Sequence, residues 1–267
     1  MNNPWLIVAL ALGCGSNGGS VDPDAGTDAG TDTGPADGGS DTGPADVGVD
    51  APTDVGTDVG ADVAPDVPID APTEEMVVEL SFEDALPDFI EVGTCAGTPS
   101  QGYEPLGFPG NTFGPTFMRC ETAQTITITL EDLPPHDSIS VDFLFAAIDS
   151  LDGEGTPPAG DFFRIDLDGT TIFREAFANA TPDQIQTYEP PVPEIVLSRR
   201  VDLGFSGPGS FFTDSAYDMS LDPQFDRIPH TASTAELVFS LEGVGVQSLD
   251  DESWAIDNVR VTTHRAE

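Results

Sequence analysis

Positively charged residues are the scarcest feature of this chain. Its 267 residues include no lysine and only eight arginines, against 48 aspartates and glutamates, and the formal net charge is −40. A nucleic-acid partner is not expected, because binding to phosphates requires a basic surface. The same charge argues against adhesion to anionic lipid headgroups, and it favours solubility and the binding of cations.

Long apolar runs are also missing, and the run at the N-terminus is short. Trp5 to Leu12 are apolar and are followed by Gly13 and Cys14. This is too short for a bilayer-spanning helix, which takes about 20 residues, but it fits the apolar core of a signal peptide. The sequence Ala11-Leu12-Gly13-Cys14 resembles the bacterial lipobox, although Ala11 stands where leucine is usual. The resemblance implies a signal peptide over residues 1–14 and a lipid on Cys14.

The residue after Cys14 bears on the destination of the chain. Gly15 is not the aspartate that retains lipoproteins at the inner membrane, so resemblance to the sorting rule implies the outer membrane or the cell surface. We therefore expect the chain to be attached to the membrane by its lipid anchor.

Aromatic residues and cations are both absent from residues 15–75. Aspartate recurs there every four or five positions among Gly, Ala, Thr, Pro and Val, so no hydrophobic core can form and the charges repel one another. Calcium-binding nonapeptide repeats would need a G-G-x-G-x-D pattern, which this stretch lacks. We predict a disordered acidic tether, which as a random coil would span roughly 45 Å.

Cysteine is scarce, with only Cys14, Cys95 and Cys120 in the chain. If Cys14 carries the lipid, the other two remain for one domain in an oxidising compartment. We therefore predict a disulfide between Cys95 and Cys120.

Residues 76–264 are predicted to form one all-β domain. Apolar residues alternate with polar ones along several segments, which indicates strands with one buried face. The clearest hairpin signal is Asp168-Gly169 between two such segments. We expect an antiparallel β-sandwich, most simply a jelly roll, with strands at 76–82, 126–130, 139–145, 163–167, 170–177, 195–203, 235–241 and 254–261.

Three segments carry a family resemblance over roughly residues 76–262. They are ELSFED at 79–84, the stretch 142–177, and LEGVGVQSLDDESWAIDNVRVT at 241–262. Together they resemble a jelly-roll domain of secreted bacterial proteins that ends in a D-E-S-W-G-I-D-N-V strand, with Ala255 here in place of glycine and Leu151 in place of an earlier tryptophan. More distantly, they resemble carbohydrate-binding modules of the galactose-binding type. The resemblance implies a binding or scaffolding domain, and residues of this kind hold a structural calcium in those modules.

Two acidic groups are candidate calcium sites, because calcium prefers six to eight oxygen ligands. The first combines Glu83 of the first strand with Asp257 of the last strand and with the loop Asp250-Asp251-Glu252, since first and last strands are often neighbours. Arg260 is expected to lie on the opposite side of a regular strand. We also expect a bulge at Asp257-Asn258, where the alternation slips. The alternative is that these acids are ordinary solvated loop residues.

The second acidic group comprises Asp149, Asp152, Glu154 and Asp161, which flank a loop rich in glycine and proline. Here the alternative is turn formation, because Asp152 precedes Gly153.

Aromatic residues suggest two roles. Trp254 begins a predicted strand that is expected to be buried, so its ring is predicted to anchor the core. Sugar-stacking platforms would come from aromatic residues of the loops, namely Tyr103, Phe108, Phe113, Phe211, Phe212 and Tyr217.

Signals of catalysis are few. The three histidines, His136, His230 and His264, lack the spacing of a zinc site, and GFSGPG around Ser206 is not a nucleophile elbow. We expect a surface lipoprotein that displays a non-catalytic binding domain, with carbohydrate or an envelope protein as partner. The alternatives are a structural or adhesive component of the envelope without a small ligand, and a sandwich-fold glycosidase.

Overall fold

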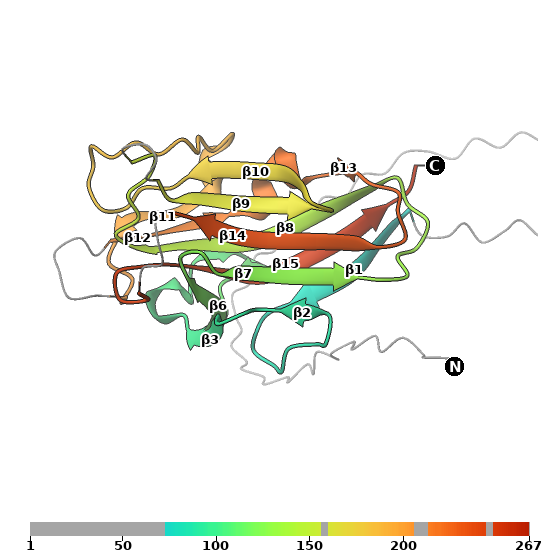
Figure 1. The fold of residues 1–267 in the computed structure, drawn as a ribbon, viewed down its shortest axis with the longest axis horizontal. Helices are drawn as coiled ribbons and strands as arrows, with labels where there is room; N and C mark the ends of the chain where they lie inside the picture. Colours follow the sequence, from blue (N-terminus) through green and yellow to red (C-terminus); the bar gives the residue numbers. More distant parts are fainter. Residues whose placement is uncertain (1–72, 156–159, 206–212, 244–247, 267) are drawn as a thin grey trace, which may run out of the picture. The chain divides into compact units, whose positions relative to one another are not determined.

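The computed structural model describes residues 73–155, 160–205, 213–243 and 248–266. These residues form two antiparallel β-sheets that pack face to face, and Figure 1 shows the two layers. The predicted antiparallel β-sandwich is therefore confirmed. Cys14 and the predicted tether lie outside the described residues, apart from the last residues of the tether, where strand β1 already begins at Glu74.

The larger sheet is built on two long central strands, one of which is the last strand of the chain. Its first strand pairs with its last strand, as expected from the sequence. The order is β11 (Val196–Val201), β12 (Asp214–Asp218), β8 (Ser138–Asp149), β15 (Glu252–His264), β6 (Thr116–Glu121) and β3 (Ala96–Pro99), with β1 (Glu74–Leu80) beside β15 and β13 (Ile228–Pro229) beside β8.

The smaller sheet contains the predicted hairpin. Asp168 and Gly169 both have positive φ, 50° and 72°, as a two-residue turn between twisted strands requires. The order is β10 (Thr170–Ala176), β9 (Phe162–Leu167), β14 (Ala235–Glu242), β7 (Thr125–Leu130) and β2 (Ile90–Glu91).

Short elements complete the described part of the domain. They are a ribbon of β4 (Gly107–Phe108) and β5 (Asn111–Thr112), and four 3₁₀ turns: η1 (Gln101–Tyr103), η2 (Pro193–Ile195), η3 (Met219–Leu221) and η4 (Pro223–Phe225). No helix among the described residues is long and apolar enough to cross a membrane.

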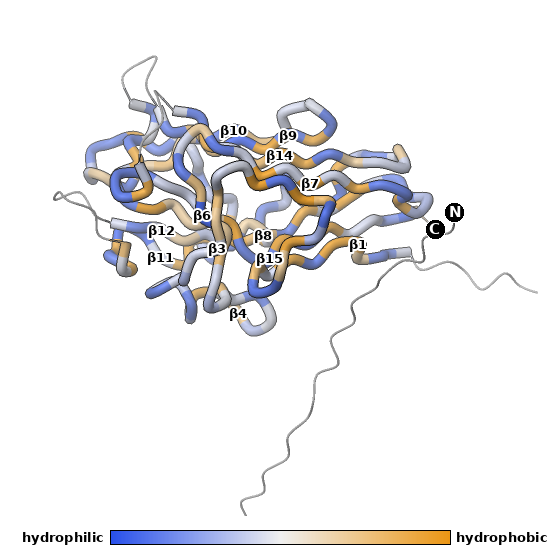
Figure 2. Tube along the Cα trace, turned by 60° about the horizontal axis from the view of Figure 1, so that its bottom comes forward, coloured by the Kyte–Doolittle hydropathy of each residue, from blue (hydrophilic) through white to orange (hydrophobic). Residues whose placement is uncertain are grey.

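The main core lies between the two sheets and is rich in phenylalanine. Alternate residues of β8, β9 and β14 point into it, and the rings of Phe143 and Phe163 meet those of Phe145 and Phe239 there. Figure 2 shows the hydrophobic residues running along these strands. Burying such side chains is the main force that holds the sheets together.

A second core covers the other face of the larger sheet. The alternate residues of β8, Leu144, Ala146 and Ile148, pack there against Tyr103 and Phe117. Strand β8 is therefore buried on both faces along its second half, which explains the continuous apolar run from Phe143 to Ile148.

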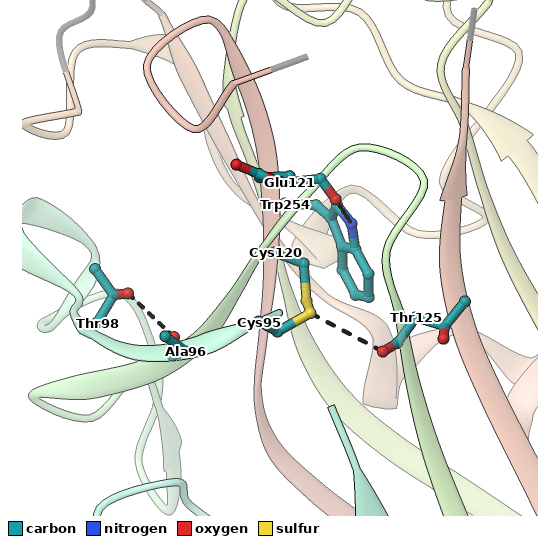
Figure 3. The surroundings of a disulfide bond; sticks show 7 residues. All are labelled: Cys95, Ala96, Thr98, Cys120, Glu121, Thr125 and Trp254. Atoms are coloured by element: carbon teal, nitrogen blue, oxygen red, sulfur yellow. Dashed lines mark hydrogen bonds between the residues drawn. A yellow bond between two sulfur atoms is a disulfide. The ribbon is translucent and has the colours of Figure 1, made fainter. Parts of the chain in front are cut away.

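The predicted disulfide is confirmed between Cys95, which directly precedes β3, and Cys120 in β6. Trp254 of β15 lies opposite Cys120 in the sheet and is fully buried. Its indole Nε1 donates a hydrogen bond to the carbonyl of Glu121 (3.2 Å), and Figure 3 shows the ring beside the disulfide. Trp254 is thus a core anchor, as predicted.

Strand β15 contains the predicted bulge. Its register with β8 shifts between Asp257 and Arg260, and Asn258 has a φ of 48°. The shift falls where β15 changes one of its neighbours, from β6 on residues 253–256 to β1 on residues 259–264. A bulge bends the strand and re-aims its side chains. Arg260, beyond it, pairs with Glu79 of β1 (3.2 Å).

Candidate metal centre and surface groove

Three carboxylates come together at one end of the sandwich. Asp152 follows β8, Asp161 directly precedes β9, and Glu252 is the first residue of β15. Each offers an oxygen that lies within 4.8 Å of an oxygen of the other two. Asp161 and Glu252 are buried, at 4% and 3% exposure, whereas Asp152 is exposed. We call these residues the acidic trio.

Backbone and amide donors orient part of the acidic trio. The Oδ2 atom of Asp161 accepts a hydrogen bond from the Asp152 N–H (2.5 Å), and the Oδ1 atom of Asp152 accepts one from the Gln184 amide (2.5 Å). Gly243 gives Asp161 its space, because a Cβ at position 243 would lie 3.0 Å from Asp161 Oδ1. These hydrogen bonds hold both aspartates in place at the end of the sandwich.

Electrostatics make the acidic trio receptive to positive charge. Burial raises the pKa of Asp161 to about 6, and the negative charge of Asp152 acts in the same direction. The hydrogen bonds with the Asp152 N–H and with Glu252 partly oppose this increase. Neighbouring carboxylates in a buried place favour either a shared proton or a bound cation. The oxygen donors suit a hard metal ion, so this group can hold a metal.

Asp149, predicted to belong with Asp152, faces elsewhere. Its φ of 62° turns it out of the regular strand, and its Oδ2 lies 3.7 Å from Arg119 Nη2. Its N–H donates to Asp214 (3.0 Å). Burial, followed by the charge of Asp214, raises the pKa of Asp149 to about 7. Glu154 is not in the acidic trio either.

Glu83 and Asp257, predicted to share an ion, lie close together around Gly114. A Cβ at position 114 would be 2.5 Å from Glu83 Oε1 and 3.7 Å from Asp257 Oδ2. Both oxygens accept backbone hydrogen bonds of 2.8 Å, Asp257 from Gly114 and Glu83 from Thr116. Burial is the main cause that raises the pKa of Asp257 to about 7. The two carboxylates therefore fasten this loop over the sheet, and a calcium ion shared by them stays a prediction.

Asp251 cannot join Glu83 and Asp257. It precedes Asp257 by six positions along an extended segment, which separates the two by roughly 20 Å at about 3.3 Å per residue. Glu252 instead lies at the level of Asp149, its partner in the β8–β15 register. The first predicted calcium group is therefore split, and one of its members completes the second. The sequence could not reveal this, because the grouping depends on that register.

The loop aromatics proposed as sugar platforms are mostly inside the domain. Tyr103, Phe113 and Tyr217 are 1% exposed or less, since they cover the sheet or fill the core. Phe108 is 41% exposed. Phe211 and Phe212 lie outside the described residues.

A groove of about 330 Å³ opens beside β10, lined by Pro191, Pro223 and six polar residues: Glu175, Thr187, Tyr188, Glu189, Asp222 and Gln224. The Tyr188 hydroxyl donates to Asp222 Oδ2 (2.8 Å), and the Thr187 hydroxyl donates to Glu175 (2.5 Å). Burial and these carboxylates raise the pKa of Tyr188 above its usual range. The groove therefore presents fixed hydrogen-bond acceptors. Sequence patterning gave no sign of it, because three separate segments form its walls.

No family model and no curated protein matches this chain. Solved structures with similar parts include dimeric latent PorU from Porphyromonas gingivalis, at 11% identity over 72% of this chain and 13% of PorU, with a TM-score of 0.37. A family GH115 4-O-methyl-α-glucuronidase matches at 14% identity over 72% of this chain and 18% of the other, with a TM-score of 0.32.

The catalytic domain of a GH87 α-1,3-glucanase matches at 15% identity over 73% of this chain and 28% of the other, with a TM-score of 0.30. This chain thus corresponds to less than a third of the length of each of these proteins. At such identities the likeness concerns the β-sandwich alone.

Proposed function

We propose that this chain is an exported lipoprotein that displays a non-catalytic binding module. Cys14 carries the lipid, the acidic segment 15–75 acts as a tether, and the sandwich binds a ligand beyond the membrane surface. The groove beside β10 is the observation that carries the proposal. Its volume falls in the range of small-molecule sites, and most of the residues that line it are polar.

The proposed ligand class is carbohydrate. Sugar hydroxyls donate hydrogen bonds, and the groove offers the acceptors to receive them, in Glu175, Glu189 and Asp222. Two of these are already oriented by neighbouring hydroxyls, which reduces the entropy lost when a ligand binds.

We assign calcium to the acidic trio as a structural ion. Carboxylate oxygens from three separate segments are the kind of donor set that calcium takes, with water and carbonyl oxygens completing its shell. Bound calcium would fix the end of β8, the start of β9 and the start of β15 relative to one another.

A glycan array probed with the full chain tests the binding proposal. We expect a restricted set of glycans to bind, and Glu189→Gln to weaken that binding at least several-fold, because Glu189 is exposed in the groove and has no structural hydrogen bond to lose. Glu194→Gln, which removes the same charge from an exposed site outside the groove, should bind as the unchanged chain does. The proposal would be refuted if no glycan bound, or if Glu189→Gln and Glu194→Gln weakened glycan binding equally.

Glycoside hydrolysis is the second candidate, and the carboxylates of the same groove favour it. Two carboxylic acids on either side of a glycosidic bond are the usual catalytic pair. To distinguish a glycosidase from a binding module, the glycans that bind on the array are incubated with the full chain and the products are analysed. Shortened glycans would indicate a glycosidase, and unchanged glycans would indicate a binding module.

A further inference from the structure

Two histidines that are 94 positions apart in the sequence meet at one end of the sandwich. His136 lies between β7 and β8, and His230 directly follows β13. Their rings are 7% and 9% exposed. The Asp168 carboxylate, in the turn between β9 and β10, lies beside them and is 45% exposed.

The outward nitrogen of each ring has an acceptor as its partner. His136 Nδ1 lies 2.6 Å from the carbonyl oxygen of Pro134, and His230 Nε2 lies 3.0 Å from Asp168 Oδ2. A carbonyl or a carboxylate can only accept, so both nitrogens carry protons. In a neutral imidazole the other nitrogen then holds a lone pair.

The two remaining nitrogens face each other. His136 Nε2 and His230 Nδ1 are 2.7 Å apart. The ring planes differ by 9° and the ring centres are 5.0 Å apart, so the rings meet edge to edge along the line of these nitrogens. Two lone pairs at this distance repel each other. A cation placed between the two nitrogens would accept both lone pairs and remove this repulsion.

We propose that His136 and His230 form a binding site for a divalent transition-metal ion, with the facing nitrogens as ligands. Histidines that bind metals usually donate their other N–H to a carboxylate or to a backbone carbonyl, and this pair shows one of each. Asp168 adds a compensating negative charge. Its exposure places the site near the surface, where water can fill the remaining coordination positions.

The donor chemistry selects the metal. Imidazole nitrogen suits copper and zinc, with Cu²⁺ the tighter in the Irving–Williams order, whereas Ca²⁺ and Mg²⁺ prefer oxygen. Nitrogen–metal bonds of about 2.0–2.1 Å require the two nitrogens to separate from 2.7 Å to about 3.3 Å at a tetrahedral angle.

The site is chemically distinct from the acidic trio. The trio, Asp152, Asp161 and Glu252, offers only carboxylates. The third histidine provides a matched control. His264 is also buried, but its Nε2 is bonded to the Ser140 hydroxyl (2.7 Å) and its Nδ1 lies 3.3 Å from Glu74.

Thermal melting of the full chain tests the site, in a Cys14→Ser background so that no free thiol competes for metal. We expect CuCl₂ and ZnCl₂ at micromolar concentrations to raise the melting temperature by several degrees in saturating calcium. His136→Gln and His230→Gln should each abolish that shift, and His264→Gln should retain it. The proposal would be overturned if these metals did not raise the melting temperature of the chain that keeps all three histidines. It would also be overturned if the increase remained in both His136→Gln and His230→Gln.

X-ray absorption of the zinc-loaded chain provides a second measurement that does not depend on the variants folding. Two imidazole ligands per zinc ion are expected. A spectrum that contains only oxygen ligands would place the metal at carboxylates and would reject the histidine site.

Discussion

At the residue scale, what a carboxylate does in this domain depends on the groups that its oxygens meet. Asp257 and Glu83 meet backbone N–H groups and fasten a loop, whereas Asp161 meets Asp152 and Glu252 as well. In the acidic trio three carboxylates lie close together in a largely buried place, which favours a bound cation. The same residue types thus serve as a loop fastening in one place and as a candidate ion site in another.

Asp161→Asn is the sharpest test of the acidic trio. In the unmutated domain, calcium at 100 times its dissociation constant should add about 2.7 kcal/mol to the free energy of unfolding. The variant should lose this gain while remaining at least as stable in EDTA, because a repelling buried charge has been removed. Calorimetry with calcium and with EDTA measures both effects.

The matched control is Asp88→Asn, at an exposed aspartate outside the acidic trio, which should keep the full calcium response. If neither calcium nor EDTA changed the melting temperature of the unmutated domain, the acidic trio would bind no calcium.

At the element scale, strand β15 organises the larger sheet. It pairs with β8 along its whole length, with β6 on its first half and with β1 on its second half. The bulge at Asp257 and Asn258 allows this change of partner. The side chain of Asn258 supports it by donating a hydrogen bond to the Thr112 carbonyl (2.6 Å).

The disulfide fastens a short edge strand to this arrangement. Cys95 precedes β3, whose four residues alone would pair weakly with β6. Because Cys95 and Cys120 close a loop with a sequence separation of 25, replacing both by serine should lower the free energy of unfolding by roughly 3 kcal/mol. Denaturant unfolding followed by the fluorescence of Trp254, the tryptophan beside the disulfide, measures the loss. An unchanged midpoint would show that the bridge contributes nothing.

At the scale of the whole molecule, the domain contains buried acids in a chain that is already strongly acidic. Burial raises the pKa of Asp149 and Asp257 to about 7 and that of Asp214 to about 6. Their ordinary value is near 4. Between about pH 4 and pH 7, the folded state therefore holds protons that the unfolded chain has released.

This difference sets the sign of the pH dependence. Where the folded state binds more protons than the unfolded state, the free energy of unfolding falls as pH rises, by at most about 1.4 kcal/mol per pH unit for each carboxyl. The stabilisation is complete below about pH 4 and is lost as pH rises through the raised values. In EDTA, the melting temperature should thus be higher at pH 5 than at pH 8. Asp149→Asn should flatten the slope, and a melting temperature that rises over this interval would contradict the argument.

The lipid anchor is the other prediction at this scale. Cys14→Ser should release the chain from the membrane fraction and abolish incorporation of labelled fatty acid, since the thiol is the acceptor. Recovery of an unmutated chain that is soluble and still contains residues 1–13 would disprove the anchor.

Features that depend on local pattern could be predicted from the amino-acid sequence. The sequence pattern predicted the strands that became β1, β7, β8, β9, β10, β11, β14 and β15, and Asp168-Gly169 predicted the hairpin turn. The disulfide was predicted because only Cys95 and Cys120 remain once Cys14 is assigned to the lipid. Strands β2 to β6, β12 and β13 were not predicted. Of these, β12, with the sequence DSAYD, is buried throughout and has no clear alternation.

Contacts between residues that are distant in the sequence could not be predicted in this way. The β8–β15 register moved Glu252 away from Asp257 and towards Asp152 and Asp161, and the folding of loops over the larger sheet buried Tyr103 and Phe113. The same folding brought His136 to His230, although their spacing in the chain gave no metal signal. Alternation fixes the face on which a side chain lies, because it follows from the geometry of a single strand. Contacts between distant segments depend on register and on loop paths, which are set by the packing of the whole domain.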